Sequence, residues 1–487
     1  MFSGGNSFFN SASEWMSDLQ LIQGVYVSCE GKPGNKDRKD ENNMIENLLY
    51  GKQTCFCGRK HSTEMNELYI EDGCLKRLRV YVESRKIRKI LLLCRKDESE
   101  KGHVIQKLLK GTGAVLQKLY IDTDEMTSEI QYAGQVMLRA DPQTEIAVIA
   151  GKGRWINISR YLCDRLHIPA VLVLTGVPEI NFCASWIAVH EDGVPHFHKI
   201  SEPAAVFADP GIMMPVDKSE ILSACIDLLG GQIALYEWRL SHLVTDEYYC
   251  AWLEQVFLDV LKPVAETVKR LTEKSSAELL IGTLVETQAA VSLLVTCADN
   301  PGLTAGSYWL MKEFWSRKVP PLCRDEKKGT EIGCRYSSLE AAYCMISRIG
   351  NMVGDRWKVF EEMDPEYRKD QMHSFFGKQA DYLWNLEMKT GKNSREKVFV
   401  RRRQTEKCYR EIQKIDYLLP SGEVIREMKQ LCSFLRREDF PSEEAFYNGL
   451  LFAKDMLSCY SGLQFLYDMG RLEQMASQMR QIRRGQE

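Results

Sequence analysis

The stretch Glu145-Ile-Ala-Val-Ile-Ala-Gly-Lys-Gly-Arg-Trp-Ile-Asn-Ile-Ser-Arg-Tyr161 joins an apolar run to an amphipathic run through two glycines. The apolar run predicts a buried strand, and the run that follows has helical spacing. Gly151 and Gly153 therefore fall in a strand-to-helix turn, where backbone amides and a helix N-terminus can approach a phosphate closely. Because any tight turn of this kind favours glycine, the pair alone is weak evidence for phosphate binding.

Similar strand and helix signals extend on both sides of this stretch. Short β-rich runs occupy residues 68–70, 89–94, 114–121, 145–150 and 170–174, with amphipathic segments between them. Strands separated by helices predict a parallel sheet with helical crossovers. After Pro210 the pattern changes to long segments of helical period, at 218–244, 246–273, 276–298, 337–353 and 442–470. We therefore predict an α/β plus all-α chain, in which an N-terminal Rossmann-like parallel-sheet domain is followed by a C-terminal helical domain.

The chain divides into three predicted regions. Residues 1–50 are expected to form an N-terminal extension and flexible linker, because residues 29–46 are polar and charged with almost nothing to bury. Residues 51–212 are the predicted nucleotide-binding-like α/β domain, and residues 213–487 are the predicted helical domain. A basic insertion near 388–410 is interpreted as a solvated face or loop, with anion or partner binding as the alternative.

Composition and charge give no support for nucleic acid or membrane partners. Lys and Arg total 64 against 67 for Asp and Glu across 487 residues, so the basic excess that favours nucleic acid or an anionic membrane is missing. The 16 cysteines are scattered, mostly singly within apolar segments, which predicts a cytoplasmic protein without disulfides. The apolar stretch 279–298 carries Glu286 and Gln288, and we expect a buried helix rather than a membrane span.

Several motifs follow one another in an order that extends from Cys55 to about Leu472. They are Cys55-Phe-Cys-Gly-Arg-Lys-His61, the turn at 151–153, His167-Ile-Pro-Ala170, Ala204-Ala-Val-Phe-Ala-Asp-Pro210, the segment 221–238 around Asp227, and Leu418-Leu-Pro-Ser-Gly-Glu-Val424. This order resembles that of the sn-glycerol-1-phosphate dehydrogenases, relatives of dehydroquinate synthase and the iron-containing alcohol dehydrogenases. The resemblance implies an active-site cleft between the two domains, where NAD(P)H reduces dihydroxyacetone phosphate while a zinc-type ion polarises the ketone.

The same resemblance implies that Asp227 is the carboxylate ligand of the catalytic metal, but both histidine ligands are replaced. Tyr308 stands at the first histidine position and Lys328 at the second. A phenol is a poor ligand and an ammonium repels a dication, so we expect a Lys328 to Asp227 ion pair in place of the ion, and no metal cofactor. In the alternative, the register is different and a histidine such as His242 or His373 serves as ligand.

The cofactor side has diverged from the family pattern as well. Its glycine turn consists of Gly151, Lys152, Gly153 and Arg154. The two basic side chains suit an anion but crowd the space of a nucleotide, so NAD or NADP is expected to fit less well than a phosphate. Thr175 survives from the loop that touches nicotinamide and substrate. Arg95 stands where a ribose-binding Asp is common, and it would either favour a 2′-phosphate or lie on the surface.

Two further groups of residues resemble metal ligands. Cys55, Cys57 and His61 could form half of a zinc site, but structural zinc needs four ligands and a second pair at suitable spacing does not follow, so a packed loop is favoured. His196 and His198 alternate on a predicted β-hairpin about residues 192–193, where exposed histidines are commoner than a metal site.

Losses at the metal, cofactor and substrate positions together favour a degenerate dehydrogenase. We expect a pseudoenzyme or a binding or partner subunit that keeps a pocket for a small phosphorylated ligand or nucleotide, in a homo-oligomer or in a hetero-oligomer with an active homologue. The first alternative is an active NAD(P)-dependent polyol-phosphate dehydrogenase, in which Tyr308 or Lys328 donates the proton to the reduced carbonyl. A phosphosugar lyase or sensor that uses the same cleft is the second alternative.

Overall fold

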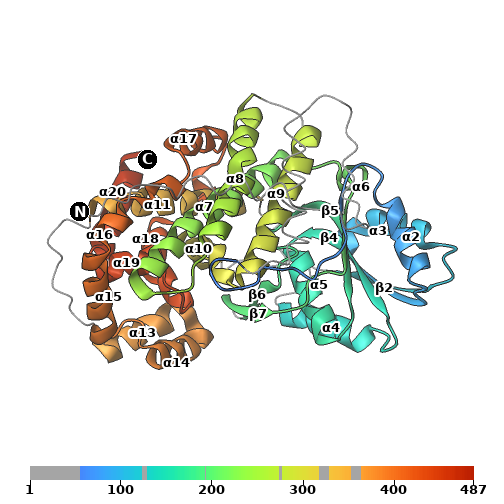
Figure 1. Cartoon of the computed structure of the whole chain (residues 1–487), viewed down its shortest axis with the longest axis horizontal. Coiled ribbons are helices and arrows are strands. Elements are labelled where there is room, and N and C mark those ends of the chain that lie inside the picture. The colour runs from blue at the N-terminus through green and yellow to red at the C-terminus, as the bar shows by residue number, and fades with distance from the viewer. Residues whose placement is uncertain are drawn as a thin grey trace, which may run out of the picture.

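The computed structural model describes residues 55–122, 129–191, 193–273, 277–316, 328–352 and 364–486. The predicted N-terminal extension, residues 1–50, lies outside these ranges. Within them, a parallel sheet flanked by helices is followed by a larger body of helices, and the two parts lie side by side (Figure 1). The predicted fold class, a Rossmann-like sheet followed by a helical domain, is confirmed.

The sheet has six strands in the order β1-β8-β5-β4-β2-β3, and every neighbouring pair is parallel. The strands are β1 (Leu68–Ile70), β2 (Lys89–Arg95), β3 (Val115–Ile121), β4 (Ile146–Gly153), β5 (Ala170–Pro178) and β8 (Ala205–Ala208). Five of them coincide with the predicted runs. The sixth, β8, was not predicted; its residues are all buried, so they show no alternation of apolar and polar side chains.

Helices connect the strands and cover the sheet. They are α2 (Lys76–Ser84), α3 (Ser99–Leu109), α4 (Glu129–Arg139), α5 (Arg154–Arg165) and the short α6 (Pro210–Met213). In the sheet, β3 lies on one side of β2 and β4 lies on the other, so the direction of the strand order reverses at β2. In open α/β sheets, ligands bind outside the carboxyl ends of the strands at such a switch point. This edge carries Arg95 and the glycines at the end of β4.

A separate two-stranded hairpin, β6 (Trp186–Glu191) and β7 (Val194–Lys199), confirms the predicted turn near residues 192–193. His196 pairs in register with Val189, and His198 with Ile187. The rings of these histidines contact aromatic side chains: His196 lies 4.7 Å from the ring centre of Tyr382 and His198 lies 4.9 Å from that of Tyr161.

The helical part begins with helices that pack against one another, and two of them, the first and the third, also contact β5. They are α7 (Lys218–Thr245), α8 (Ala251–Thr272), α9 (Ala277–Ala298), α10 (Ser307–Ser316) and α11 (Lys328–Ile346). The remaining helices are α12 (Ile349–Met352), α13 (Pro365–Phe376), α14 (Ala380–Thr390), α15 (Arg395–Lys407), α16 (Tyr409–Ile412), α17 (Gly422–Leu431), α18 (Glu443–Phe452), α19 (Gly462–Asp468) and α20 (Leu472–Gln486). Figure 1 shows these later helices on the side of the molecule away from the sheet.

Helix α7 is the central element of the helical part. Asp217 caps its N-terminus by accepting a hydrogen bond from the backbone of Ser219, and Asp246 ends it in the left-handed conformation. Most of its side chains are buried on all sides, because α8, α9, α10, α11 and α15 all contact it. A helix in this position can hold the polar side chains of Asp227 and Glu237 inside the protein.

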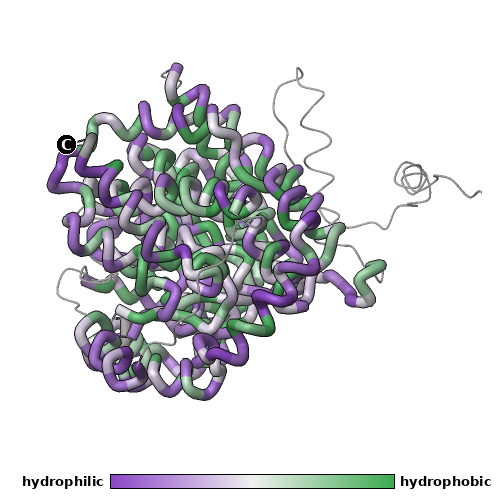
Figure 2. Tube along the Cα trace, turned by 90° about the vertical axis from the view of Figure 1, so that its left-hand side faces the viewer, coloured by the Kyte–Doolittle hydropathy of each residue, from purple (hydrophilic) through white to green (hydrophobic). Residues whose placement is uncertain are grey.

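Apolar segments gather in the interior and hydrophilic ones along the outer turns (Figure 2). Among the described residues, one helical stretch is long and apolar enough to cross a membrane, Leu280–Ala298 within α9. In this structure 78% of that window is buried, as in the core helix of a soluble protein. The expected buried helix is therefore confirmed.

The basic stretch 388–410 is helical rather than a loop, and part of it is buried. It contains the end of α14, all of α15 and the start of α16. Arg401 is 8% exposed, and its guanidinium pairs with both carboxylate oxygens of Asp468 at 2.6 and 2.8 Å. The solvated-face interpretation is therefore wrong for Arg401, whose charge stabilises the contact between α15 and α19.

Candidate functional site

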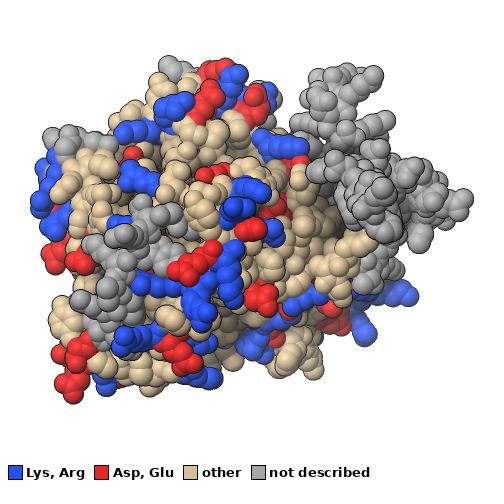
Figure 3. All heavy atoms as spheres, turned by 60° about the vertical axis from the view of Figure 1, so that its left-hand side comes forward, with Lys and Arg blue, Asp and Glu red and all other residues tan. Residues whose placement is uncertain are grey.

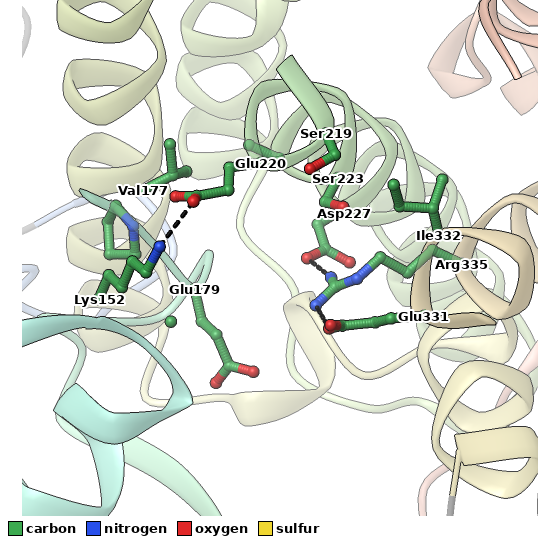
Figure 4. A pocket seen from close by; sticks show the side chains of 13 residues that line it. Lys152, Val177, Glu179, Ser219, Glu220, Ser223, Asp227, Glu331, Ile332 and Arg335 are labelled. Atoms are coloured by element: carbon green, nitrogen blue, oxygen red, sulfur yellow. Dashed lines mark hydrogen bonds and ion pairs between the residues drawn. The ribbon is translucent and has the colours of Figure 1, made fainter. Parts of the chain in front are cut away.

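A cleft with about 600 Å³ of empty space, its open mouth included, lies between the sheet and the helices. It is lined by Lys152, Gly153, Val177, Pro178, Glu179, Ser219, Glu220, Ser223, Ala224, Asp227, Glu331, Ile332 and Arg335. The ends of β4 and β5 form one wall, and the first half of α7 with the start of α11 forms the other (Figure 4). The predicted position of the cleft, between the two domains, is confirmed.

The Asp227 carboxylate lies in this cleft and is 6% exposed. The Tyr308 hydroxyl donates a hydrogen bond to its Oδ1 at 2.5 Å, and the Lys312 ammonium lies 3.6 Å from the same oxygen. The Arg335 guanidinium donates to Oδ2, and its other nitrogen donates to Glu331 at 2.6 Å. Figure 4 shows the Asp227, Arg335 and Glu331 side chains pointing toward one another across the wall of the cleft.

The surrounding charges determine the protonation states of Asp227 and Tyr308. Burial by itself raises the pKa of the Asp227 carboxyl, but the charges of Arg335 and Lys312 and the hydrogen bond from Tyr308 lower that pKa below its usual value. Burial and the neighbouring Asp227 charge raise the pKa of the Tyr308 phenol well above its usual value. At neutral pH the carboxylate is therefore ionised and the phenol keeps its proton.

A chain of alternating charges leads from this carboxylate to the glycine turn. Lys312 lies 3.6 Å from Oε1 of Glu313, whose side chain is fully buried. Nε2 of His190 lies 2.8 Å from Oε2 of Glu313. The Arg154 guanidinium lies 3.9 Å from Oε1 of the same carboxylate. The same guanidinium is 3.8 Å from Glu179. Arg154, predicted to bind a cofactor phosphate, is thus surrounded by protein carboxylates.

The turn between β4 and α5 needs its glycines for two different reasons. Gly153 has a φ of +54°, which side chains rarely adopt, and a Cβ on Gly151 would lie 2.1 Å from the Trp155 ring. Lys152 donates to Oε1 of Glu220 at 2.6 Å, across the cleft mouth seen in Figure 4. Backbone conformation and packing therefore account for the glycines, and a phosphate at Lys152 would compete with Glu220.

Arg95 and Thr175 lie at the same edge of the sheet as this turn, because β2, β4 and β5 are neighbours. The Arg95 side chain donates to both carboxylate oxygens of Asp97, at 2.9 and 2.8 Å. Since Arg95 is 6% exposed, the alternative of a surface residue is wrong. Thr175 is buried on β5 and donates to Oε1 of Glu98 at 2.7 Å. The fold brings these predicted residues together, each with a carboxylate partner.

Lys328 is the first residue of α11, and its side chain lies outside the described part of the structure. Its predicted ion pair with Asp227 therefore stays a prediction. The described partner is Arg335, seven residues later and hence on the same face of α11. The glycine at 333, which suggested the register, has a packing role: a Cβ there would lie 2.0 Å from the backbone oxygen of Asp439.

The histidines considered as alternative ligands have other neighbours. Nδ1 of His242 lies 2.7 Å from the backbone oxygen of Glu247, near the C-terminal end of α7. Nε2 of His373 lies 3.2 Å from the exposed carboxylate of Asp381. The Asp227 contacts described here are a phenol, an ammonium and a guanidinium instead.

The fold defines the class of protein. The chain superposes with a TM-score of 0.54 on an iron-containing alcohol dehydrogenase from Corynebacterium glutamicum, with 11% identity and coverage of 86% of this chain and 96% of that one. An alcohol dehydrogenase from Oenococcus oeni gives a TM-score of 0.53 at 14% identity, with 85% of this chain and 98% of that chain covered. These similarities show the fold of the iron-containing alcohol dehydrogenases.

Curated relatives define the chain more narrowly. It is 20% identical over 311 residues to the glycerol-1-phosphate dehydrogenase [NAD(P)+] of Halalkalibacterium halodurans, a match that covers 62% of this chain and 77% of the relative. The corresponding protein of Bacillus licheniformis is 22% identical over 330 residues, 64% of this chain and 79% of the relative. No family model matches the chain. The resemblance drawn from the order of motifs is confirmed: this chain is a divergent homologue of the glycerol-1-phosphate dehydrogenases.

The residues around Asp227 do not fit the divalent ion that the resemblance implies. A dication bound by this carboxylate would stand beside the Lys312 ammonium and the Arg335 guanidinium, which already neutralise it. Like charges at such distances repel strongly in a buried site. The phenol of Tyr308 would also have to lose a proton whose pKa is raised. We therefore derive no step through a metal at this position.

A second place in the structure corrects the expectation that no metal is used. Sγ of Cys55, Cys57 and Cys250 and a ring nitrogen of His61 lie within 4.8 Å of one another, a grouping suited to a metal ion. The expectation that no metal is used is therefore wrong, and the fourth ligand that the packed-loop interpretation lacked is present. The sequence pattern lacked a fourth ligand because Cys250 lies 195 residues from Cys55 and reaches it through the tertiary fold.

The thiols of this cluster differ in their proton affinity. Burial raises the pKa values of Cys55 and Cys250. Burial acts in the same direction on Cys57, but hydrogen bonds, first that of the Tyr248 hydroxyl, lower its pKa to about 6.

Sequence reasoning missed three residues that the structure brings into these sites, Lys312, Arg335 and Cys250. For two of them, the local sequence contained a pattern that could have pointed to the site. Lys312 follows Tyr308 by one helical turn, and Arg335 follows Glu331 by one helical turn, so each pair shares a helix face. Cys250 had no such pattern, because it stands alone at the start of α8.

Proposed function

We propose that this chain is a degenerate glycerol-1-phosphate dehydrogenase-like protein, impaired in the reaction of its relatives, that acts as a pseudoenzyme or as a binding or partner subunit. The observation that supports this proposal is that the Asp227 carboxylate is occupied by contacts with Tyr308, Lys312 and Arg335. In the chemistry that the resemblance implies, this carboxylate holds the ion that polarises the ketone. In this chain the carboxylate neutralises two protein cations instead.

The groups in the cleft are poor replacements for that electrophile. Arg335 is shared between Asp227 and Glu331, so its charge is compensated on both sides. The Tyr308 proton is engaged by Asp227, and its raised pKa makes it a weak acid toward a carbonyl oxygen. These residues stabilise one another more than they would stabilise a developing alkoxide.

The cleft keeps features that suit a small phosphorylated ligand or nucleotide. The N-terminus of α5 opens toward it next to Lys152, and Ser219 and Ser223 of α7 line the opposite wall. A phosphate would take the place of Glu220 at Lys152, with the helix N-terminus favouring the negative charge. The bound state we propose therefore begins with opening of the Lys152 to Glu220 ion pair.

The surface and the cysteines support a soluble, cytoplasmic protein without nucleic acid or membrane partners. On the face shown in Figure 3, basic and acidic side chains are interspersed rather than gathered by sign. All the described cysteines are free thiols. We propose that the chain forms a homo-oligomer or joins an active homologue, with the cleft contributing a ligand site to the assembly.

One pair of measurements tests the function. The full chain is assayed for NAD(P)H oxidation with dihydroxyacetone phosphate, with Zn²⁺, Ni²⁺ or Mn²⁺ added in turn, and titrated calorimetrically with glycerol 1-phosphate, inorganic phosphate and NADH. We expect turnover at the level of the protein-free blank and saturable binding of at least one phosphorylated probe. Turnover that Asp227→Asn abolishes would overturn the pseudoenzyme, and absence of binding by every probe would overturn the ligand pocket.

One observation favours an active alternative. Arg335 lines the cleft and Lys312 lines a smaller cavity that shares Asp227 with it. The two positive charges therefore meet at Asp227, where a ketone oxygen could accept hydrogen bonds from them. In that case NAD(P)H oxidation would persist with a chelator present and would fall in Lys312→Met. Lys328, whose side chain is not described, would be tested as the proton donor by Lys328→Met in the same assay.

A further inference from the structure

The cluster of Cys55, Cys57, His61 and Cys250 joins two parts of the chain that are far apart in sequence. The first three residues precede β1, and Cys250 is the residue before α8. His61 and Cys250 are buried, and Cys55 and Cys57 are half-buried. The donor atoms thus converge at the junction between the start of the α/β part and the helical part.

The spacing of the donor atoms matches a tetrahedral ion. Sγ of Cys55 lies 3.5 Å from Sγ of Cys250, and Nε2 of His61 lies 3.2 Å from Sγ of Cys57 and 3.4 Å from Sγ of Cys250. Zinc bonds of about 2.3 Å to sulfur and about 2.0 Å to nitrogen place ligand atoms roughly 3.5 to 3.8 Å apart in a tetrahedron. These three separations differ from the tetrahedral values by a few tenths of an ångström, and the other donor pairs lie within 4.8 Å of one another.

Neighbouring groups hold the ligands in the orientation that a metal needs. Nδ1 of His61 lies 2.8 Å from the backbone oxygen of Cys297 in α9, which fixes the tautomer so that the Nε2 lone pair faces the sulfurs. The Trp252 ring stacks on the imidazole at 5.6 Å. The Tyr248 hydroxyl lies 3.2 Å from Sγ of Cys57, where it can donate to a thiolate. Metal-bound histidines and thiolates commonly have partners of this kind.

We infer that these four residues form a closed Cys₃His zinc site that fastens the segment before β1 to the helical part. All four tetrahedral positions are filled by protein, so the ion has no open position for a substrate. The site is also apart from the cleft. Tyr248 and Tyr249, which precede Cys250, pack beside Trp238 of α7. Trp238 lies about 16 Å along that helix from Asp227 at 1.5 Å per residue. Its role is therefore structural.

Metal content of the full chain tests this assignment. The protein is purified untagged, in reductant and without chelator, and its zinc is measured by mass spectrometry. We expect about one zinc ion per chain, lost in Cys250→Ser and in Cys57→Ser. The matched control Cys344→Ser removes a thiol of α11 outside the cluster and should keep the metal. Zinc content unchanged in Cys250→Ser, or wild-type protein that stays empty in micromolar zinc, would overturn the site.

A second readout needs no variant that could misfold. Cobalt is exchanged into the wild-type protein, and tetrahedral thiolate coordination should give a charge-transfer band in the near ultraviolet with intense visible bands. Weak octahedral bands alone, or no cobalt uptake by the fully reduced protein, would overturn the assignment. Asp227→Asn separates this proposal from that of the cleft: zinc retained in this variant supports the cluster, and zinc lost from it while Cys250→Ser keeps zinc would overturn both.

Discussion

The cleft around Asp227 and the cysteine–histidine cluster pose the same question, which is where a divalent ion can lie in this chain. In the cleft, the carboxylate that the resemblance assigns to the metal is already neutralised by Lys312 and Arg335. In the cluster, four donors converge, and the contact of His61 Nδ1 with the backbone oxygen of Cys297 leaves its Nε2 facing the sulfurs. The difference teaches that a metal site depends on the charge surrounding its ligands as much as on the ligands themselves.

The largest expected effect comes from removing the carboxylate of the cleft. Asp227→Asn leaves the Lys312 and Arg335 charges buried without their shared counter-charge, so we expect a loss of about 3–5 kcal/mol in the free energy of unfolding. Urea denaturation measures it. The control, Asp381→Asn, removes an exposed carboxylate that pairs with His373 and should cost less than about 1 kcal/mol. Equal effects of the two variants would show that the cleft charges are solvated rather than coupled.

Removing metal from the cluster should give the next largest effect. If the free zinc concentration is about a thousandfold above the Kd of the folded chain for zinc, chelation lowers the free energy of unfolding by about 4 kcal/mol. Thermal unfolding with and without a strong chelator measures the shift, and limited proteolysis should then cut the chain before β1. Cys250→Ser should show no further shift with chelator. If the chelator lowered the unfolding temperature of Cys250→Ser as much as that of the wild type, the effect would come from a metal bound elsewhere.

Acid should reduce the contribution of Asp227 to the stability of the fold, and comparison with Asp227→Asn measures this reduction. The pKa of Asp227 is lowered in the folded protein, so the unfolded chain takes up this proton first as pH falls. Its stabilising contribution is therefore complete above the unfolded pKa of about 3.9, and it is lost as pH falls through the folded-state pKa. The stability difference between wild type and Asp227→Asn should be equal at pH 6 and pH 8 and shrink below about pH 4. A difference that grows in acid would contradict the ion-pair account.

The smallest expected effect concerns the mouth of the cleft. Glu220→Gln removes the competitor for Lys152, and a half-buried pair worth about 1 kcal/mol corresponds to a gain of roughly fivefold in affinity for inorganic phosphate. Calorimetric titration measures the gain. Glu83→Gln, which removes the exposed partner of Arg79 on α2, is the matched control and should leave phosphate affinity unchanged. The same affinity in both variants would place phosphate binding, where it is observed, outside this turn.

Local sequence patterns by themselves determined the fold class, whereas the cleft between the two domains was implied by the family resemblance. The apolar runs at 89–94, 114–121, 145–150 and 170–174 are strands, and the change of period after Pro210 marks the helical part. These features depend on neighbouring residues only, because strand and helix periodicities are properties of a short window. The role of Asp227 came from the family resemblance instead, although the residue lies in a mostly apolar segment of helical spacing.

Tertiary structure alone decided which charges and thiols meet. The sequence pointed to Lys328 as the partner of Asp227, whereas the described partners are Arg335 on the same face of α11 and Lys312 one turn after Tyr308. Cys250 completes the cluster only because the α7 to α8 connection folds against the segment before β1. Such contacts join residues about a hundred or more positions apart, and their identity depends on helix packing and side-chain direction rather than on local pattern.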